Sequence, residues 1–149
     1  MSLPSNRFSR TRAPALWCVP VLLALSGCGD AGPDCSAPDI RNSVVRSVAD
    51  DKNNALLRFA VENSDAVAQL VSRATAEAEK SAILEKAKQD AVYSLDNTIA
   101  VNSRSARAAS CTGLLSIRVG DTTVQKDVDF NVEQTTDGKT SVSVKPFLF

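Results

Sequence analysis

Histidine is absent from the 149-residue sequence. Histidine is the side chain most often used as a general base near neutral pH, a common transition-metal ligand and the central member of Ser-His-Asp triads. Its absence excludes such triads and disfavours transition-metal sites. Carboxylates, lysines and one tyrosine remain. The sequence therefore predicts a protein without enzymatic activity or a bound cofactor, while carboxylate chemistry stays open.

A net positive charge is also lacking, since 17 Lys and Arg residues balance 17 Asp and Glu residues. Three of the basic residues, Arg7, Arg10 and Arg12, precede the first acidic residue, Asp30. Without these three, the chain carries 14 basic and 17 acidic residues, a net charge near −3. A surface of that sign gives no electrostatic reason to expect nucleic acid or an anionic membrane surface as a partner.

The sequence has no apolar run long enough to span a membrane. Residues 13–25 follow the basic segment 1–12 and are apolar, but they number only 13, whereas a membrane-spanning helix needs about 20. Pro14 and Pro20 interrupt the run, which argues against a buried core helix. A basic segment, a short apolar segment and small residues at its end are the order of a secretory signal peptide.

The residues that end this run, Leu25-Ser26-Gly27-Cys28, resemble the lipobox of bacterial lipoproteins. An ordinary secretory cleavage site prefers a small residue three positions before the cut, where this chain has Leu25. The resemblance implies that residues 1–27 are removed and that Cys28 carries a diacylglycerol and an acylated amino group inserted into the bilayer. Gly29, rather than aspartate, follows the cysteine, which implies the outer membrane, with the domain facing the periplasm.

Two cysteines remain once Cys18 leaves with the signal peptide and Cys28 is acylated. Cys35 and Cys111 are an even pair in an oxidising compartment, so the sequence predicts a disulfide between them. The alternative is two separately buried thiols. Two cysteines without histidine offer too few ligands for a metal site.

Removal of the signal peptide leaves 122 residues, enough for one domain. Residues 28–34 are small and polar and predict a tether, and residues 35–149 predict a single globular domain. The segment Ser36-Ala37-Pro38-Asp39 is typical of a helix start.

Two further segments predict helices. Residues 55–62 are ambiguous between helix and strand, with helix favoured. Residues 66–90 are rich in Ala, Glu, Lys and Gln and predict one long helix, but their apolar side chains form two opposite stripes. Either the helix bends near Lys80-Ser81, or its far end is covered by another element or a partner.

In the second half of the chain the apolar period changes from 3.6 to 2. Four strands are predicted, at residues 92–101, 110–119, 122–134 and 140–148. Asp137-Gly138 predicts a hairpin between the last two, and Pro146 an edge position for the last. These elements predict an α+β fold, with N-terminal helices packed on a four-stranded antiparallel meander, similar in outline to cystatin-like and NTF2-like domains. That likeness of outline implies no function.

Two groups of charged side chains are candidate sites. Arg104 and Arg107 are either an anion contact or part of an exposed loop, which is favoured. Asp127, Asp129 and Glu133 share one face of a predicted strand and form a candidate catalytic or cation-binding row. The solvated face of an antiparallel sheet predicts the same pattern and is favoured.

The sequence thus predicts a lipid-anchored envelope lipoprotein that acts as a non-enzymatic binding or structural module for an envelope protein. The alternative is an inhibitor or immunity-type protein that blocks an envelope or extracellular enzyme. An enzyme that uses Asp127 and Asp129 ranks third.

Overall fold

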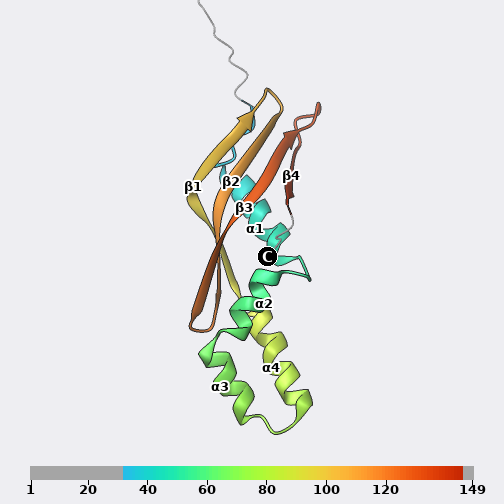
Figure 1. Ribbon diagram of the computed structural model, residues 1–149. Coiled ribbons are helices and arrows are strands. Elements are labelled where there is room, and N and C mark those ends of the chain that lie inside the picture. The colour runs from blue at the N-terminus through green and yellow to red at the C-terminus, as the bar shows by residue number, and fades with distance from the viewer. Residues whose placement is uncertain (1–31, 146–149) are drawn as a thin grey trace, which may run out of the picture.

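The computed structural model describes residues 32–145, whose elements follow the predicted order, helices first and strands after (Figure 1). The helices are α1 (Pro38–Ala49), α2 (Ala55–Glu62), α3 (Asp65–Arg73) and α4 (Glu77–Gln89). The strands are β1 (Val92–Arg104), β2 (Ala108–Val119), β3 (Thr122–Gln134) and β4 (Thr140–Val144). The predicted α+β class is confirmed. The expected signal peptide and Cys28 lie outside the described residues.

The four strands form one open antiparallel sheet in the order β1-β2-β3-β4, which is the predicted meander. On β2, every second residue from Ala109 to Val119 faces the covered side, and Leu115 and Ile117 are fully buried. Phe130 on β3 is equally buried. Because successive side chains of a strand point to opposite faces, the alternating apolar pattern produces a sheet with one buried side.

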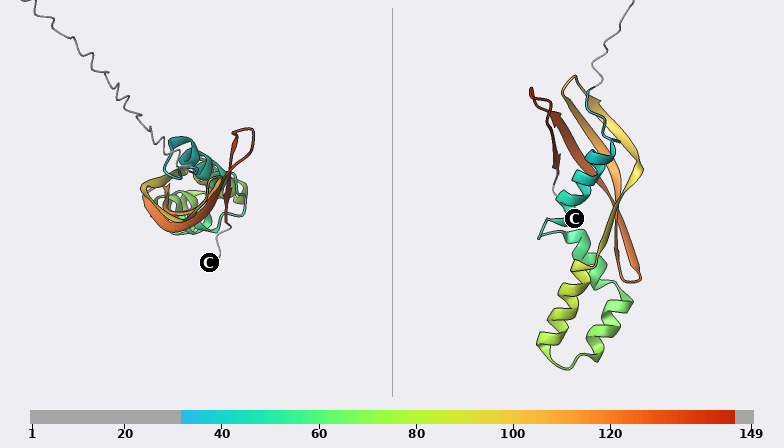
Figure 2. Two further views of the ribbon diagram at one scale, coloured as in Figure 1. Left: turned by 90° about the horizontal axis from the view of Figure 1, so that it is seen from above. Right: turned by 180° about the vertical axis from the view of Figure 1, so that it is seen from behind.

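Helices α1 and α2 cover the buried side, and the sheet curves around them (Figure 2). Pro38 lies in the first turn of α1, where its missing N–H costs no helical hydrogen bond. The two helices bury Ile40, Val44, Val48, Leu56, Ala60 and Val61. This apolar surface and the inner face of the sheet form one hydrophobic core.

Buried Asn54 joins α1 to α2. Its side-chain oxygen accepts a hydrogen bond from the N–H of Leu57 at 3.0 Å, and its amide donates to the carbonyl of Val48 at 3.1 Å. The first bond caps α2. Residues 55–62 are therefore a helix, the favoured of the two alternatives.

The single long helix predicted for residues 66–90 is wrong. The chain turns at residues 74–76, well before Lys80-Ser81, and α3 and α4 form a hairpin of two helices (Figure 1). The apolar residues of the two stripes are divided between two helices that pack against each other, with Val67 on α3 and Ile83 on α4 in the contact region. This hairpin extends beyond the end of the sheet where β2 and β3 are joined.

Strand β1 continues three residues beyond its predicted end at Val101, and β2 begins two residues early. Ser105 closes their connection, since its N–H donates to the carbonyl of Ala108 at 2.7 Å. β1 buries Leu95 and half-buries Tyr93 and Ile99 between exposed neighbours, in the predicted alternation, whereas residues 102–104 are all exposed. The last strand, β4, ends at Val144, and Pro146 lies outside the described residues.

Candidate functional site

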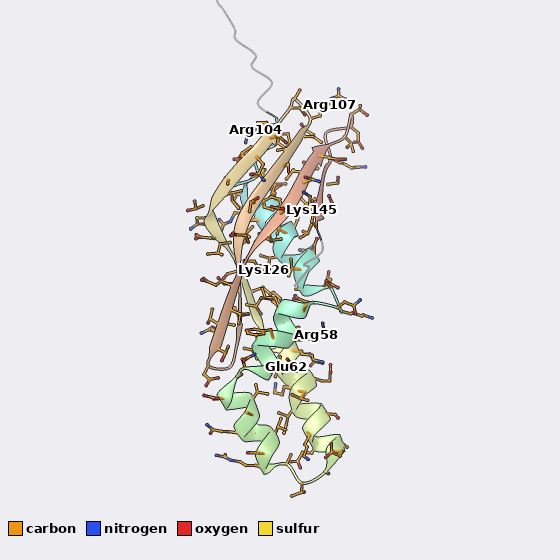
Figure 3. The ribbon with its side chains drawn as sticks, viewed as in Figure 1. Arg58, Glu62, Arg104, Arg107, Lys126 and Lys145 are labelled. Atoms are coloured by element: carbon orange, nitrogen blue, oxygen red, sulfur yellow. A yellow bond between two sulfur atoms is a disulfide. The ribbon has the colours of Figure 1, made fainter. Side chains whose placement is uncertain are left out.

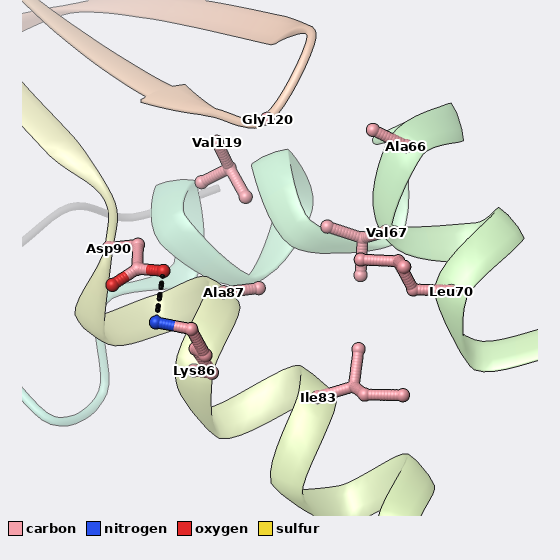
Figure 4. Close-up of a pocket in the computed structure, with 9 residues that line it drawn as sticks. All are labelled: Ala66, Val67, Leu70, Ile83, Lys86, Ala87, Asp90, Val119 and Gly120. Atoms are coloured by element: carbon pink, nitrogen blue, oxygen red, sulfur yellow. Dashed lines mark ion pairs between the residues drawn. The ribbon is translucent and has the colours of Figure 1, made fainter. Parts of the chain in front are cut away.

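A groove of about 250 Å³ lies between α3, α4 and the β2–β3 turn (Figure 4). Its apolar lining comprises Ala66, Val67, Leu70, Ile83, Ala87 and Val119. Leu70 is 52% exposed although it lines an apolar surface. The arrangement suits the binding of apolar side chains.

The charged side chains that line this groove are Lys86 and Asp90, which pair with each other at 2.8 Å. Both are largely exposed, so the pair adds little stability. It marks a polar edge beside the apolar lining. The groove therefore offers a surface for recognition.

Asp121, in the β2–β3 turn, fixes the turn to α3. Its carboxylate accepts hydrogen bonds from the hydroxyl of Ser64 at 2.8 Å and from the N–H of Ala66 at 3.2 Å. These two bonds, that from Ser64 first, hold the pKa of Asp121 below its usual value. Ser64 also caps α3, because its oxygen accepts the N–H of Val67 at 3.3 Å.

Gly120, the residue before Asp121, has a φ of +56°, a backbone conformation that glycine adopts at little cost. As the first of two turn residues between Val119 and Thr122, it has the place that a type II′ turn reserves for glycine. A Cβ on Gly120 would lie 2.8 Å from the Ser64 oxygen. The turn, the cap and the groove thus depend on one another.

The opposite end of the sheet carries Gly32, the first described residue, which is buried. A Cβ on Gly32 would overlap the carbonyl oxygen of Ser105 in the β1–β2 connection. Arg104 and Arg107 flank Ser105 and are exposed (Figure 3). Neither guanidinium forms an ion pair with another residue of the 32–145 region. Arg107 lies in the exposed β1–β2 connection, as the favoured alternative requires, whereas Arg104 is the last residue of β1 rather than part of a loop.

Cys35 and Cys111 are bonded to each other, with their Cα atoms 6.5 Å apart. Both are fully buried. Cys35 lies three positions after Gly32 and three positions before α1, and the bond fixes it to the first half of β2. Cys28, the expected site of lipidation, lies outside the described residues.

The carboxylates of Asp127, Asp129 and Glu133 lie on the exposed face of β3. Asp129 accepts a hydrogen bond from the hydroxyl of Thr112 at 2.6 Å and lies 4.0 Å from the ammonium of Lys145. Among residues 32–145, no three His, Cys, Asp or Glu side chains are grouped closely enough to hold a metal ion. The row has the features of a solvated sheet face.

Protein-family models, curated proteins and solved structures give no match to this chain. Within the described region, no helix is both long and apolar enough to cross a membrane. Sequence reasoning missed the groove, although the second apolar stripe of residues 66–90 was its signal. The proposed function therefore rests on the geometry of the two ends of the domain.

Proposed function

We propose that this protein is a bacterial envelope lipoprotein, held in the bilayer through acylated Cys28, that acts as a non-enzymatic binding module. The observation that carries the proposal is the position of two features at opposite ends of the long domain. The described chain begins at Gly32, beside the β1–β2 connection, whereas the apolar groove lies between the β2–β3 turn and the helices α3 and α4 (Figure 1).

The distance between lipid and domain is limited by covalent geometry. Four Cα–Cα steps separate Cys28 from Gly32, and a fully extended chain covers about 14 Å in four steps. Gly32 is buried against the domain, and the Cys35–Cys111 bond fixes the chain three residues later. An acylated Cys28 would therefore hold this end of the sheet near the bilayer and turn the groove away from it.

The size of the groove favours apolar side chains of a partner protein as its occupant. Sites for small molecules typically have volumes of about 300–1,000 Å³, above the roughly 250 Å³ found here. One or two apolar side chains would cover Leu70 and Ile83, and the Lys86–Asp90 pair would remain at the polar rim. An envelope protein with a short apolar segment has these properties.

Lipidation is tested by metabolic labelling with a clickable fatty acid. The wild-type chain should be labelled and the Cys28→Ala variant should not. Label that persists in the variant would refute the acylation of Cys28, and with it the proposed attachment.

The groove is tested by site-specific photocrosslinking in cells, with the crosslinking residue at Leu70 or, as a control, at Asp127 on the exposed sheet face. We expect a discrete adduct from Leu70 that Ala87→Glu abolishes, because this change puts a charge into the groove. Ala78→Glu, an exposed position on the same helix, should leave the adduct intact. Equal adducts from Asp127, or an adduct insensitive to Ala87→Glu, would contradict the groove as the binding site. A stoichiometric adduct with a hydrolase that loses its turnover would instead support the inhibitor alternative.

A further inference from the structure

We infer that Arg104 and Arg107 contact the phosphate groups of phospholipids and so orient the domain on the bilayer that holds Cys28. The inference rests on the proposed function, because it requires the acylated cysteine. It assigns a lipid-facing surface to the end of the sheet opposite the apolar groove (Figure 3).

The two arginines lie at the end of the domain from which the chain runs to Cys28. The two arginines flank Ser105, whose carbonyl oxygen is in contact with Gly32. Cys28 lies within about 14 Å of Gly32 along the chain. With its acyl chains in the hydrocarbon core, a cysteine lies at the headgroup layer, which is roughly 5–8 Å thick on each side of the bilayer. The β1–β2 connection is thus the part of the described domain nearest to the lipid phosphates.

The positive charges of the two arginines also favour a contact with phosphate. The guanidinium groups of Arg104 and Arg107 have no ion-pair partner among residues 32–145, and the planar fork of arginine matches a phosphate with two hydrogen bonds. Two of the nearby acids have other partners, since Asp34 accepts the N–H of Ser36 at 3.0 Å and Asp137 pairs with Lys139 at 3.1 Å. The net charge near −3 of residues 28–149 matters little here, because exposed charges more than about 8 Å away are largely screened at physiological salt.

A depression of about 290 Å³ beside Arg104 decides between two sources of phosphate. Ser103, Ser110 and Asn131 line it and could hold an oxyanion, but the carboxylate of Glu133 lines it too. That carboxylate repels a free phosphate that enters the depression. The arginines therefore act outward, on a layer of headgroup phosphates, rather than inward on one bound ion.

The test uses the full acylated protein, purified from cell envelopes and reconstituted into vesicles with brominated acyl chains. The sole tryptophan, Trp17, lies in the segment expected to be removed, so Ala106→Trp, at an exposed position, introduces a single fluorescent probe. Bromine should quench this probe but not the one introduced by Thr75→Trp, in the far turn of the helical hairpin. Quenching at position 106 should be stronger with phosphatidylglycerol than with phosphatidylcholine and weaker at high salt.

Removal of both charges by Arg104→Ser and Arg107→Ser should reduce the ratio of bilayer-contacting to free orientations by about 25-fold, roughly fivefold for each arginine. The matched control, Arg73→Ser with Arg118→Ser, removes the same charge at the groove end and should leave the quenching unchanged. Equal melting temperatures of the two double variants show that both are folded, and Arg104→Lys with Arg107→Lys should retain most of the quenching.

Failure of the lipid contact can be distinguished from failure of the proposed function. Unchanged quenching in the Arg104→Ser, Arg107→Ser variant, or no quenching of the probe at position 106 in an acylated chain, overturns the lipid contact and leaves the proposed function intact. Loss of quenching on addition of inorganic phosphate, at ionic strength matched with chloride, shows a discrete phosphate site and overturns the lipid assignment. A chain that carries no acyl group overturns both proposals.

Discussion

The sheet with α1 and α2 differs from the α3–α4 hairpin in the amount of apolar surface that each buries. β2 alone buries Leu115, Ile117 and Val119, whereas α3 buries only Val67 and α4 no residue at all. Regions with few buried contacts open at low free energy. The domain therefore combines a stable scaffold with a weakly held hairpin, whose groove would gain stability when a partner covers it.

The largest expected effect is loss of the disulfide, which lies in the stable scaffold and closes a span of 76 residues around the hairpin. Replacement of Cys35 and Cys111 by serine should lower the free energy of unfolding by about 4–5 kcal/mol on chain-entropy grounds. Urea unfolding measures this loss, and reduction of the wild-type protein is the control that should reproduce it. A reduced protein with an unchanged midpoint would contradict the expectation.

The comparison is tested directly by the same substitution in each region. Leu115→Ala, at a fully buried position, should cost about 2–5 kcal/mol because it leaves a cavity in the core. Leu84→Ala, at a position on α4 that is 36% exposed, should cost less than about 0.5 kcal/mol. Chemical denaturation of both variants gives the two values. Equal losses would show that the hairpin shares the stability of the scaffold.

Gly120→Ala should loosen the hairpin by about 1–3 kcal/mol, through backbone strain and displacement of the Ser64 cap. Gly138→Ala is the matched control, since Gly138 also has a positive φ of 81° but open space around it. Hydrogen exchange should speed up in α3 more than in β2 for the first variant only. Equal exchange profiles for the two variants would mean that the contact with Ser64 does not hold α3.

The smallest effect concerns the charge of Asp121. Its pKa is lowered by hydrogen bonds in the folded state, so its contribution to stability is present above its unfolded pKa, about 3.9, and is lost as the pH falls through the lower folded value. Asp121→Asn should therefore melt at a lower temperature than the wild type at pH 7, and this difference should shrink below about pH 4. A difference that is constant from pH 7 to pH 2 would exclude this linkage.

The predictable parts of the fold depend on local patterns. Alternation of apolar residues placed β2 and β3, and the Asp137-Gly138 pair placed the last hairpin, because both signals lie within a few neighbouring residues. The extension of β1 to Arg104 was missed because residues 102–104 are all exposed, so no buried face produces alternation in this part of the strand. The turn at residues 74–76 was missed because Ala74-Thr75-Ala76 contains neither glycine nor proline.

The groove was harder to predict because its parts are distant in sequence. Ser64 and Asp121 are 57 positions apart, yet their hydrogen bond fixes the turn that completes the groove. No periodic pattern specifies such a pair, since it forms only when the sheet docks on the helices. Likewise, the positions of Arg104 and Arg107 at the same end of the domain as Gly32 could not be predicted, because they depend on where β1 ends and the chain turns back.

The disulfide also determines what happens to a cut chain. The turn between α3 and α4 is exposed at Thr75 and Ala76, and such turns are preferred sites of proteolysis. Cys35 precedes this turn and Cys111 follows it. A protease that cuts at the turn therefore produces two fragments that stay covalently joined, and the whole sheet, β1 to β4, remains attached to the fragment that contains Cys35.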